Sequence, residues 1–239
     1  MDSPSPAWAQ TVPELVALTG PVLASSQPRG TFTHATTGGA GPGGYAALGQ
    51  LIADVTGWPY PQAAARLVLE PLGMSSSWFP ASWPGAGPRA VTGYRVDEDG
   101  SFRPAPQRVS TVPAVAGLWA TAADLVRFGA GWSSLLPAAL AAEALRPQAG
   151  PPGHPVRVGF GWRINESINA AGHAGGGPDG SASLVVRRGG SRVHVAMTSR
   201  HIPIEPVNGR VIRAITEDPE RPLYDPRVLI SYSLPARRA

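Results

Sequence analysis

The residues that could do chemistry in this chain are histidines, serines and carboxylates. Cysteine is absent, and all 20 residues in the combined lysine and arginine count are arginine. Thiolate catalysis, disulfides and cysteine metal sites are therefore excluded. The histidines, at positions 34, 154, 173, 194 and 201, show no zinc-type spacing with one another or with carboxylates. No metal site is expected.

One glycine-rich stretch fits a dinucleotide-binding pattern. Residues 39–44 satisfy Gly-x-Gly-x-x-Gly and lead into a predicted helix. However, residues 31–37 are too polar for the buried parallel strand that should precede such a turn. A second helix follows the first, where a dinucleotide fold needs a strand with an acidic end. A nucleotide-binding oxidoreductase is therefore disfavoured, and no cofactor is expected.

A second glycine-rich stretch, residues 172–180, surrounds His173. It can be a plain turn before a hairpin, or a strand that lets a ligand approach the backbone where side chains are missing. The residues after it predict an antiparallel hairpin, with strands at 181–188 and 192–199 joined by Gly-Gly-Ser. That pattern favours the strand.

Residues 43–74 carry the clearest helix signals and predict two consecutive helices. Gly57 suits a left-handed cap, and Pro59 prevents continuation. Pro61 suits the first turn of the second helix, which should end at Leu69. An apolar face at helical spacing is expected from Tyr45, Leu48, Ile52 and Val55.

The remaining pattern predicts an α+β fold, with a helical region followed by an antiparallel sheet and a C-terminal helix. Thr121 with Asp124 three residues on indicates a capping box. Residues 90–102 predict a hairpin and 159–164 a strand. Further helices are expected at 13–23, 137–145 and 207–216. The resulting division is a flexible lead at 1–12, a mainly helical region at 13–150, the sheet with its closing helix at 151–216, and a tail at 217–239.

Several strings in the first helical stretch resemble one known family. They are Gly44-Tyr45, Leu48-Gly49, Val55-Thr56-Gly57 and Pro71 to Met74, in that order. They are similar to a segment of the serine β-lactamase-like family, which includes class C β-lactamases, D-alanyl-D-alanine carboxypeptidases and related esterases. The resemblance covers roughly residues 13–216 and implies a partial β-lactamase/transpeptidase-like fold. Because the matching residues are mostly packing positions, they indicate fold more strongly than chemistry.

The family mechanism needs a serine followed three residues later by lysine, and this sequence contains no lysine. The family places that pair before the Gly-Tyr helix, so the chain is expected to start after it. A gene start placed too late or a truncated gene would explain this. As written, the chain is expected to be a homologue of β-lactamase-related serine hydrolases, which act on a β-lactam, a D-Ala-D-Ala peptide or an ester. The chain itself is expected to lack catalytic competence. The alternative is a non-catalytic protein that binds a peptide or small acyl compound.

The resemblance implies site residues around His173, which holds the family's Lys/His strand position. It implies substrate contacts for Ala174, Gly175, Gly176 and Tyr45, with the Gly176 N–H as one oxyanion donor. Ala174 departs from the usual hydroxyl residue and so loses a carboxylate contact. His34 is a second catalytic candidate, for the place of the family's tyrosine. Residues 167–169 match Ser-x-Asn but lie so close to His173 that the match is interpreted as chance.

The composition is that of a globular protein, with 239 residues, 43% hydrophobic and 15% charged, and a net charge of +4. The arginines are scattered, so nucleic acid is not an expected partner. No basic leader with an apolar core opens the chain, and no apolar run reaches the ~20 residues that span a bilayer. Cytoplasmic location without membrane contact is therefore expected. A homo-oligomer or a partner chain is expected to complete the sheet.

Overall fold

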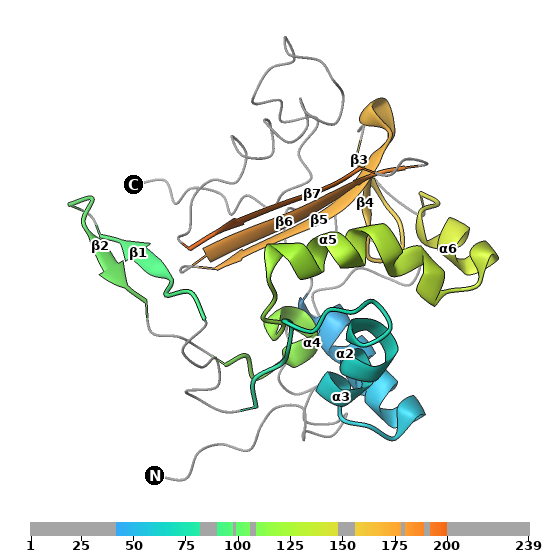
Figure 1. Cartoon of the computed structure of the whole chain (residues 1–239), viewed down its shortest axis with the longest axis horizontal. Helices are drawn as coiled ribbons and strands as arrows, with labels where there is room; N and C mark the ends of the chain where they lie inside the picture. The colour runs from blue at the N-terminus through green and yellow to red at the C-terminus, as the bar shows by residue number, and fades with distance from the viewer. Residues whose placement is uncertain are drawn as a thin grey trace.

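The computed structural model describes residues 42–81, 90–97, 99–105, 109–147, 156–177, 180–188 and 192–199. These residues form helices on one face of a five-stranded antiparallel sheet, with a separate two-stranded hairpin (Figure 1). The predicted α+β arrangement is therefore confirmed. The helices predicted at 13–23 and 207–216, and the predicted lead and tail, lie outside the described residues.

The sheet follows chain order from β3 to β7, and every neighbouring pair is antiparallel. Its strands are β3 (Val156–Val158), β4 (Arg163–Asn165), β5 (Ala170–Gly177), β6 (Gly180–Arg187) and β7 (Val193–Thr198), with a 3-10 turn, η4 (Glu166–Ile168), between β4 and β5. The predicted hairpin at 181–199 is confirmed as β6 and β7. Of the strand predicted at 159–164, only residues 163 and 164 form one, at the start of β4. The Gly159 N–H donates to the Trp162 carbonyl at 2.8 Å and Gly161 has φ 74°, so a turn separates β3 from β4.

The first helical stretch forms as predicted, with one irregularity. Helix α2 (Pro42–Thr56) ends at Gly57, whose φ of 69° confirms the left-handed cap, and α3 (Tyr60–Ala64) starts with Pro61 in its first turn. The helix then continues as a π-helix, η2 (Ala65–Leu69). Within it the Glu70 N–H donates five residues back, to the Ala65 carbonyl.

The remaining helices are α4 (Pro113–Ala116), α5 (Ala122–Gly131), η3 (Trp132–Leu135, a 3-10 turn) and α6 (Ala138–Ala144). The hairpin predicted at 90–102 forms with shorter strands, β1 (Tyr94–Val96) and β2 (Phe102–Pro104). Figure 1 shows α5 lying along one face of the sheet, with α2, α3 and α4 grouped together. Among the described helices, none has both the length and the apolar character needed to cross a bilayer.

The sheet and helix α5 share a core built on two tryptophans. Trp132 and Trp162 lie with ring centroids 5.0 Å apart, and Phe128 of α5 stacks on Trp162 at 6.2 Å. Buried Ile164, Ala171 and Leu184 contribute from three strands. Because these residues come from β4, β5 and β6, the core fixes the helices against the middle of the sheet.

The predicted apolar face of α2 is not the buried one. Leu48 and Val55 are 53% and 79% exposed, whereas Ala46 and Gly49 are buried. A Cβ placed on Gly49 would lie 2.4 Å from the Cβ of Ala114. Helix α2 therefore packs on α4 through its smallest residues, because a larger side chain would hold the two backbones apart.

This close approach generates a prediction. Gly49→Ala should lower the free energy of unfolding by about 1–2 kcal/mol, since overpacking outweighs the ~1 kcal/mol gain in helix propensity. Gly44→Ala is the matched control, because no described atom lies within 4 Å of a Cβ there. It should stabilise by about 0.5–1 kcal/mol. Urea unfolding of both variants measures the difference, and equal effects would contradict the packing argument.

A second prediction concerns His194 on β7. Burial, followed by repulsion from Arg192, lowers the pKa of its imidazole, and its Nε2 is buried with no hydrogen-bond partner among the described residues. Because the unfolded chain then binds a proton more readily, stability present above about pH 6.5 is lost as the pH falls through the lowered pKa. His194→Gln should reduce the drop in Tm between pH 8 and pH 5. An unchanged drop in the variant would exclude this role.

Candidate functional site

Strand β5 has one edge, called the open edge, where it has no strand partner among the described residues along most of its length. Strand β6 pairs with all of it, from Ala170 to Gly177, whereas β4 pairs only with its first three residues and stops at Gly172. From His173 to Gly177, therefore, no described strand pairs with β5 on the β4 side. Along such an edge every second residue directs its N–H and C=O outward, where another extended segment can pair with them.

The register places the side chains of His173 and Ala174 on opposite faces. His173 pairs with Leu184, whose side chain belongs to the core beneath the helices, so His173 lies on the helix-covered face. Ala174 is 3% exposed and faces the other way, beside the buried Ser183. The side chain of Ala174 therefore lies on the opposite face of the sheet from the side chain of His173. Its predicted substrate contact remains a prediction that only its backbone could fulfil.

The two glycines predicted to contact substrate lie on the exposed part of this edge. Gly175 shares the face of His173, and no described atom lies within 4 Å of a Cβ built there. Gly176 follows it and is also exposed. With no side chains in the way, a ligand can approach the backbone closely at both positions.

Tyr45 approaches the same edge from the helical side. It lies in the first turn of α2, and its ring stands edge-on to the imidazole of His173, with centroids 6.4 Å apart and an interplanar angle of 90°. The structure thus brings together His173, Gly175, Gly176 and Tyr45. His34 lies outside the described residues. Asn169 is engaged elsewhere, because its Nδ2 donates to the Arg188 carbonyl at 3.0 Å.

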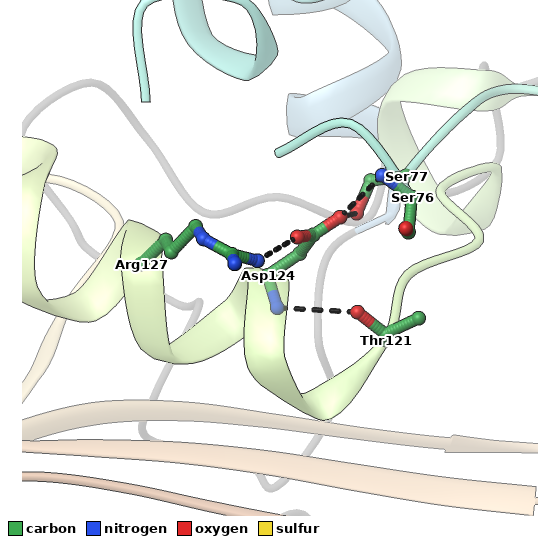
Figure 2. Close-up of polar contacts among 5 residues, drawn as sticks. All are labelled: Ser76, Ser77, Thr121, Asp124 and Arg127. Atoms are coloured by element: carbon green, nitrogen blue, oxygen red, sulfur yellow. Dashed lines mark hydrogen bonds and ion pairs between the residues drawn. The ribbon is translucent and has the colours of Figure 1, made fainter. Parts of the chain in front are cut away.

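A buried carboxylate, that of Asp124, connects the segment after η2 to helix α5, which packs on the sheet. Figure 2 shows Asp124, which is 0% exposed, accepting from the Ser76 N–H at 2.9 Å and the Ser77 hydroxyl at 2.8 Å. Its own N–H donates to the Thr121 hydroxyl, which confirms the predicted cap of α5. Arg127 adds an ion pair at 2.6 Å. The carboxylate therefore joins the segment after η2 to the first turn of α5.

Two tryptophans reinforce the same connection. Trp78 and Trp119 exchange both backbone hydrogen bonds at 2.9 Å, and their rings stack with centroids 6.2 Å apart. Residues 76–78, which follow the α2–α3 unit, are thus fastened to residues 119–124, which lead into α5. Since α5 packs on β6 and β7, this connection helps to hold Tyr45 opposite His173.

Sequence reasoning missed Ser76 and Ser77 as partners of Asp124. Asp124 was expected to complete a local capping box, but its carboxylate is used by residues 47 and 48 positions away. Nothing in the spacing of the two serines signals such a contact. Within the described ranges, no three His, Cys, Asp or Glu side chains gather where they could hold a metal ion.

The fold agrees with comparisons to known proteins. The family model described as Beta-lactamase matches residues 41–216, and the chain belongs to that family. None of the curated proteins compared with the chain matches its sequence.

Solved structures show the same fold at low sequence identity. A penicillin-binding protein from Bacillus halodurans matches with a TM-score of 0.72 and 16% identity, over 87% of this chain and 65% of its own. The octameric penicillin-binding protein homologue from Pyrococcus abyssi gives 0.71 and 20%, over 90% and 49%. A D-amino acid amidase from Ochrobactrum anthropi SV3, complexed with D-phenylalanine, gives 0.57 and 22%, over 74% and 60%. The chain therefore spans about half to two thirds of the length of these relatives.

The buried carboxylate leads to a prediction for stability. Asp124→Ala should cost about 3 kcal/mol, because two donors lose a charged acceptor, and Ser77→Ala should cost about 1 kcal/mol. The double variant should cost less than the sum, since both changes remove the same hydrogen bond. Thermal and urea unfolding measure the cycle. Ser134→Ala, which removes an exposed hydroxyl bonded within its own turn, is the control and should change little.

Strict additivity of the Asp124 and Ser77 variants would contradict the coupling. Arg127→Gln should cost less than about 1 kcal/mol, because the side chain of Arg127 is 53% exposed and its ion pair is screened by solvent.

Proposed function

We propose that this chain binds an amide- or ester-bearing acyl compound as an extra strand along the open edge of β5, and that its 239 residues alone do not form an acyl-enzyme. The observation that carries the proposal is the edge at residues 174–177, where no described strand pairs with β5 on the β4 side and three of the four residues are glycine. The membership of the Beta-lactamase family and the penicillin-binding and amidase neighbours support the ligand class.

Binding along this edge would use the backbone for affinity. An extended ligand that adds to an exposed strand gains main-chain hydrogen bonds, and its side groups then meet the walls on either side. Here one wall is formed by His173 and the ring of Tyr45. The N–H of Gly176 would be one donor to the carbonyl oxygen of the ligand. Stabilising an oxyanion takes convergent donors, which a single N–H does not supply.

Covalent chemistry by the family route would require an activated serine. A serine hydroxyl is a weak nucleophile until an adjacent base takes its proton, and the family assigns that task to a lysine three residues on. The sequence has no lysine, so no such pair exists within it. Binding without turnover follows from this.

A second candidate function is hydrolysis by a longer polypeptide. It is favoured because this chain covers only part of its structural relatives, namely 65% of the Bacillus halodurans protein and 49% of the Pyrococcus abyssi protein. Translating the adjoining upstream DNA in the same frame tests it. A Ser-x-x-Lys within about one domain's length would favour the hydrolase, and a stop codon would favour the binding protein.

Binding to the edge can be tested with a strand-compatible block. Gly175→Val adds a β-branched side chain where a Cβ meets no described atom, so the fold should persist while a ligand is kept away. Binding of a D-alanyl-D-alanine peptide, measured by calorimetry, should weaken at least about tenfold, or ~1.4 kcal/mol. Met197→Val, at an exposed site on β7, is the control and should bind as the unsubstituted chain does.

The same preparation tests the absence of acylation. Incubation with a penicillin-type probe should leave the intact mass of the chain unchanged. A stoichiometric adduct would overturn the non-acylating part of the proposal. Equal binding by the Gly175→Val variant would overturn the assignment of the edge.

A further inference from the structure

A cavity of about 590 Å³ lies between the sheet and the helical segment formed by α5, η3 and α6. Its floor is formed by one residue from each of three strands, Ala171, Val186 and Val193. Its walls include Trp132, Trp162 and Leu145. The cavity lies toward the start of β5 and the end of β6. None of the residues from His173 to Gly176 lines it, so it is separate from the open edge.

The cavity is open to solvent on one side, so its volume is that of a pocket at the surface and not of a void in the core. Sites for small organic ligands typically occupy about 300–1,000 Å³. Ser133 and Ala142 line the cavity and are exposed, so solvent can reach it. A ligand could enter without rearrangement of the sheet.

The lining combines an apolar interior with positive charge at one end. The indole rings of Trp132 and Trp162, tilted by 48° to each other and mostly buried, form part of the apolar lining. Arg187 and Arg188 line the cavity where β6 ends. Among the described residues that line it, none is acidic. A ligand that suits this lining has an apolar body and one anionic group, because a cation would be repelled and a doubly charged ligand would have to bury charge.

We propose that this cavity binds an amphipathic monocarboxylate such as a medium-chain fatty acid. The acyl chain lies against Trp132 and Trp162, and the carboxylate accepts hydrogen bonds from the guanidinium group of Arg188. Arg187 alternates with Val186 along β6, so its side chain faces away from the cavity floor. Arginine suits this task, since its planar group can bind a carboxylate through two parallel N–H donors. The site does not depend on the open edge of β5 or on the function proposed for it.

Titration of the purified chain with decanoate tests the proposal. Tryptophan fluorescence should change saturably, because two indoles form the wall, and calorimetry should give the same affinity. Decanol should bind less tightly, and decylamine and acetate should give no saturable signal. A preference for decylamine, or equal affinities for decanoate and decanol, would overturn the assigned role of Arg188.

Two pairs of variants locate the site. Ala142→Phe adds a ring at the exposed rim and should abolish binding, whereas Ala139→Phe, on the same helix and outside the lining, should not. Arg188→Gln should weaken decanoate binding about fivefold without changing decanol binding. Arg103→Gln, on β2, should leave both unchanged. Circular dichroism checks the fold of each variant. Wild-type affinity in both Ala142→Phe and Arg188→Gln would overturn the proposal.

Discussion

The buried carboxylate of Asp124 is the interaction on which the arrangement of the described residues depends most. It satisfies a backbone N–H and a hydroxyl of a distant segment while the same residue caps helix α5. A charge with no solvent exposure is tolerated only when its oxygens are fully used. Because its partners follow helices α2 and α3, and α5 packs on the sheet, this side chain helps to set the distance between the two parts, together with the backbone hydrogen bonds between Trp78 and Trp119.

That distance matters because the candidate site is shared between the two parts. The sheet supplies a glycine-rich edge and His173, whereas the helical unit supplies Tyr45. Neither part alone supplies both the strand edge and the tyrosine. Strand β4 ends early, and the side chains around the exposed length of β5 are small enough to leave it accessible.

Local signals in the sequence predicted local structure well. The left-handed cap at Gly57, the proline start of α3 and the Thr121 cap follow from the conformational limits of single residues, and all three formed. The position of the histidine strand followed from the resemblance of residues 172–176 to the family's His-x-Gly strand, and β5 confirms it. Contacts between distant segments were not predictable. The burial of Gly49 depends on Ala114, and the role of Asp124 depends on two serines nearly fifty residues away. The run at 159–164 looked like a strand because its aromatic residues mask the tight turn at Gly161.

The π-helix η2 has a consequence for how this chain can change in length. Its wider ring, with a hydrogen bond from the Glu70 N–H to the Ala65 carbonyl, holds one residue more than an α-helical turn would. The bond from the Met74 N–H to the Leu69 carbonyl belongs to the cap that follows, in which Gly73 has a φ of 64°. Leu69 and Met74 can both be buried although they are five positions apart. Loss of one residue there would let the turn close as a regular α-helical turn, so the residues on either side would keep their facing. Ser76 and Ser77 would then still face Asp124, so a one-residue deletion should be tolerated better in this turn than elsewhere in the helix.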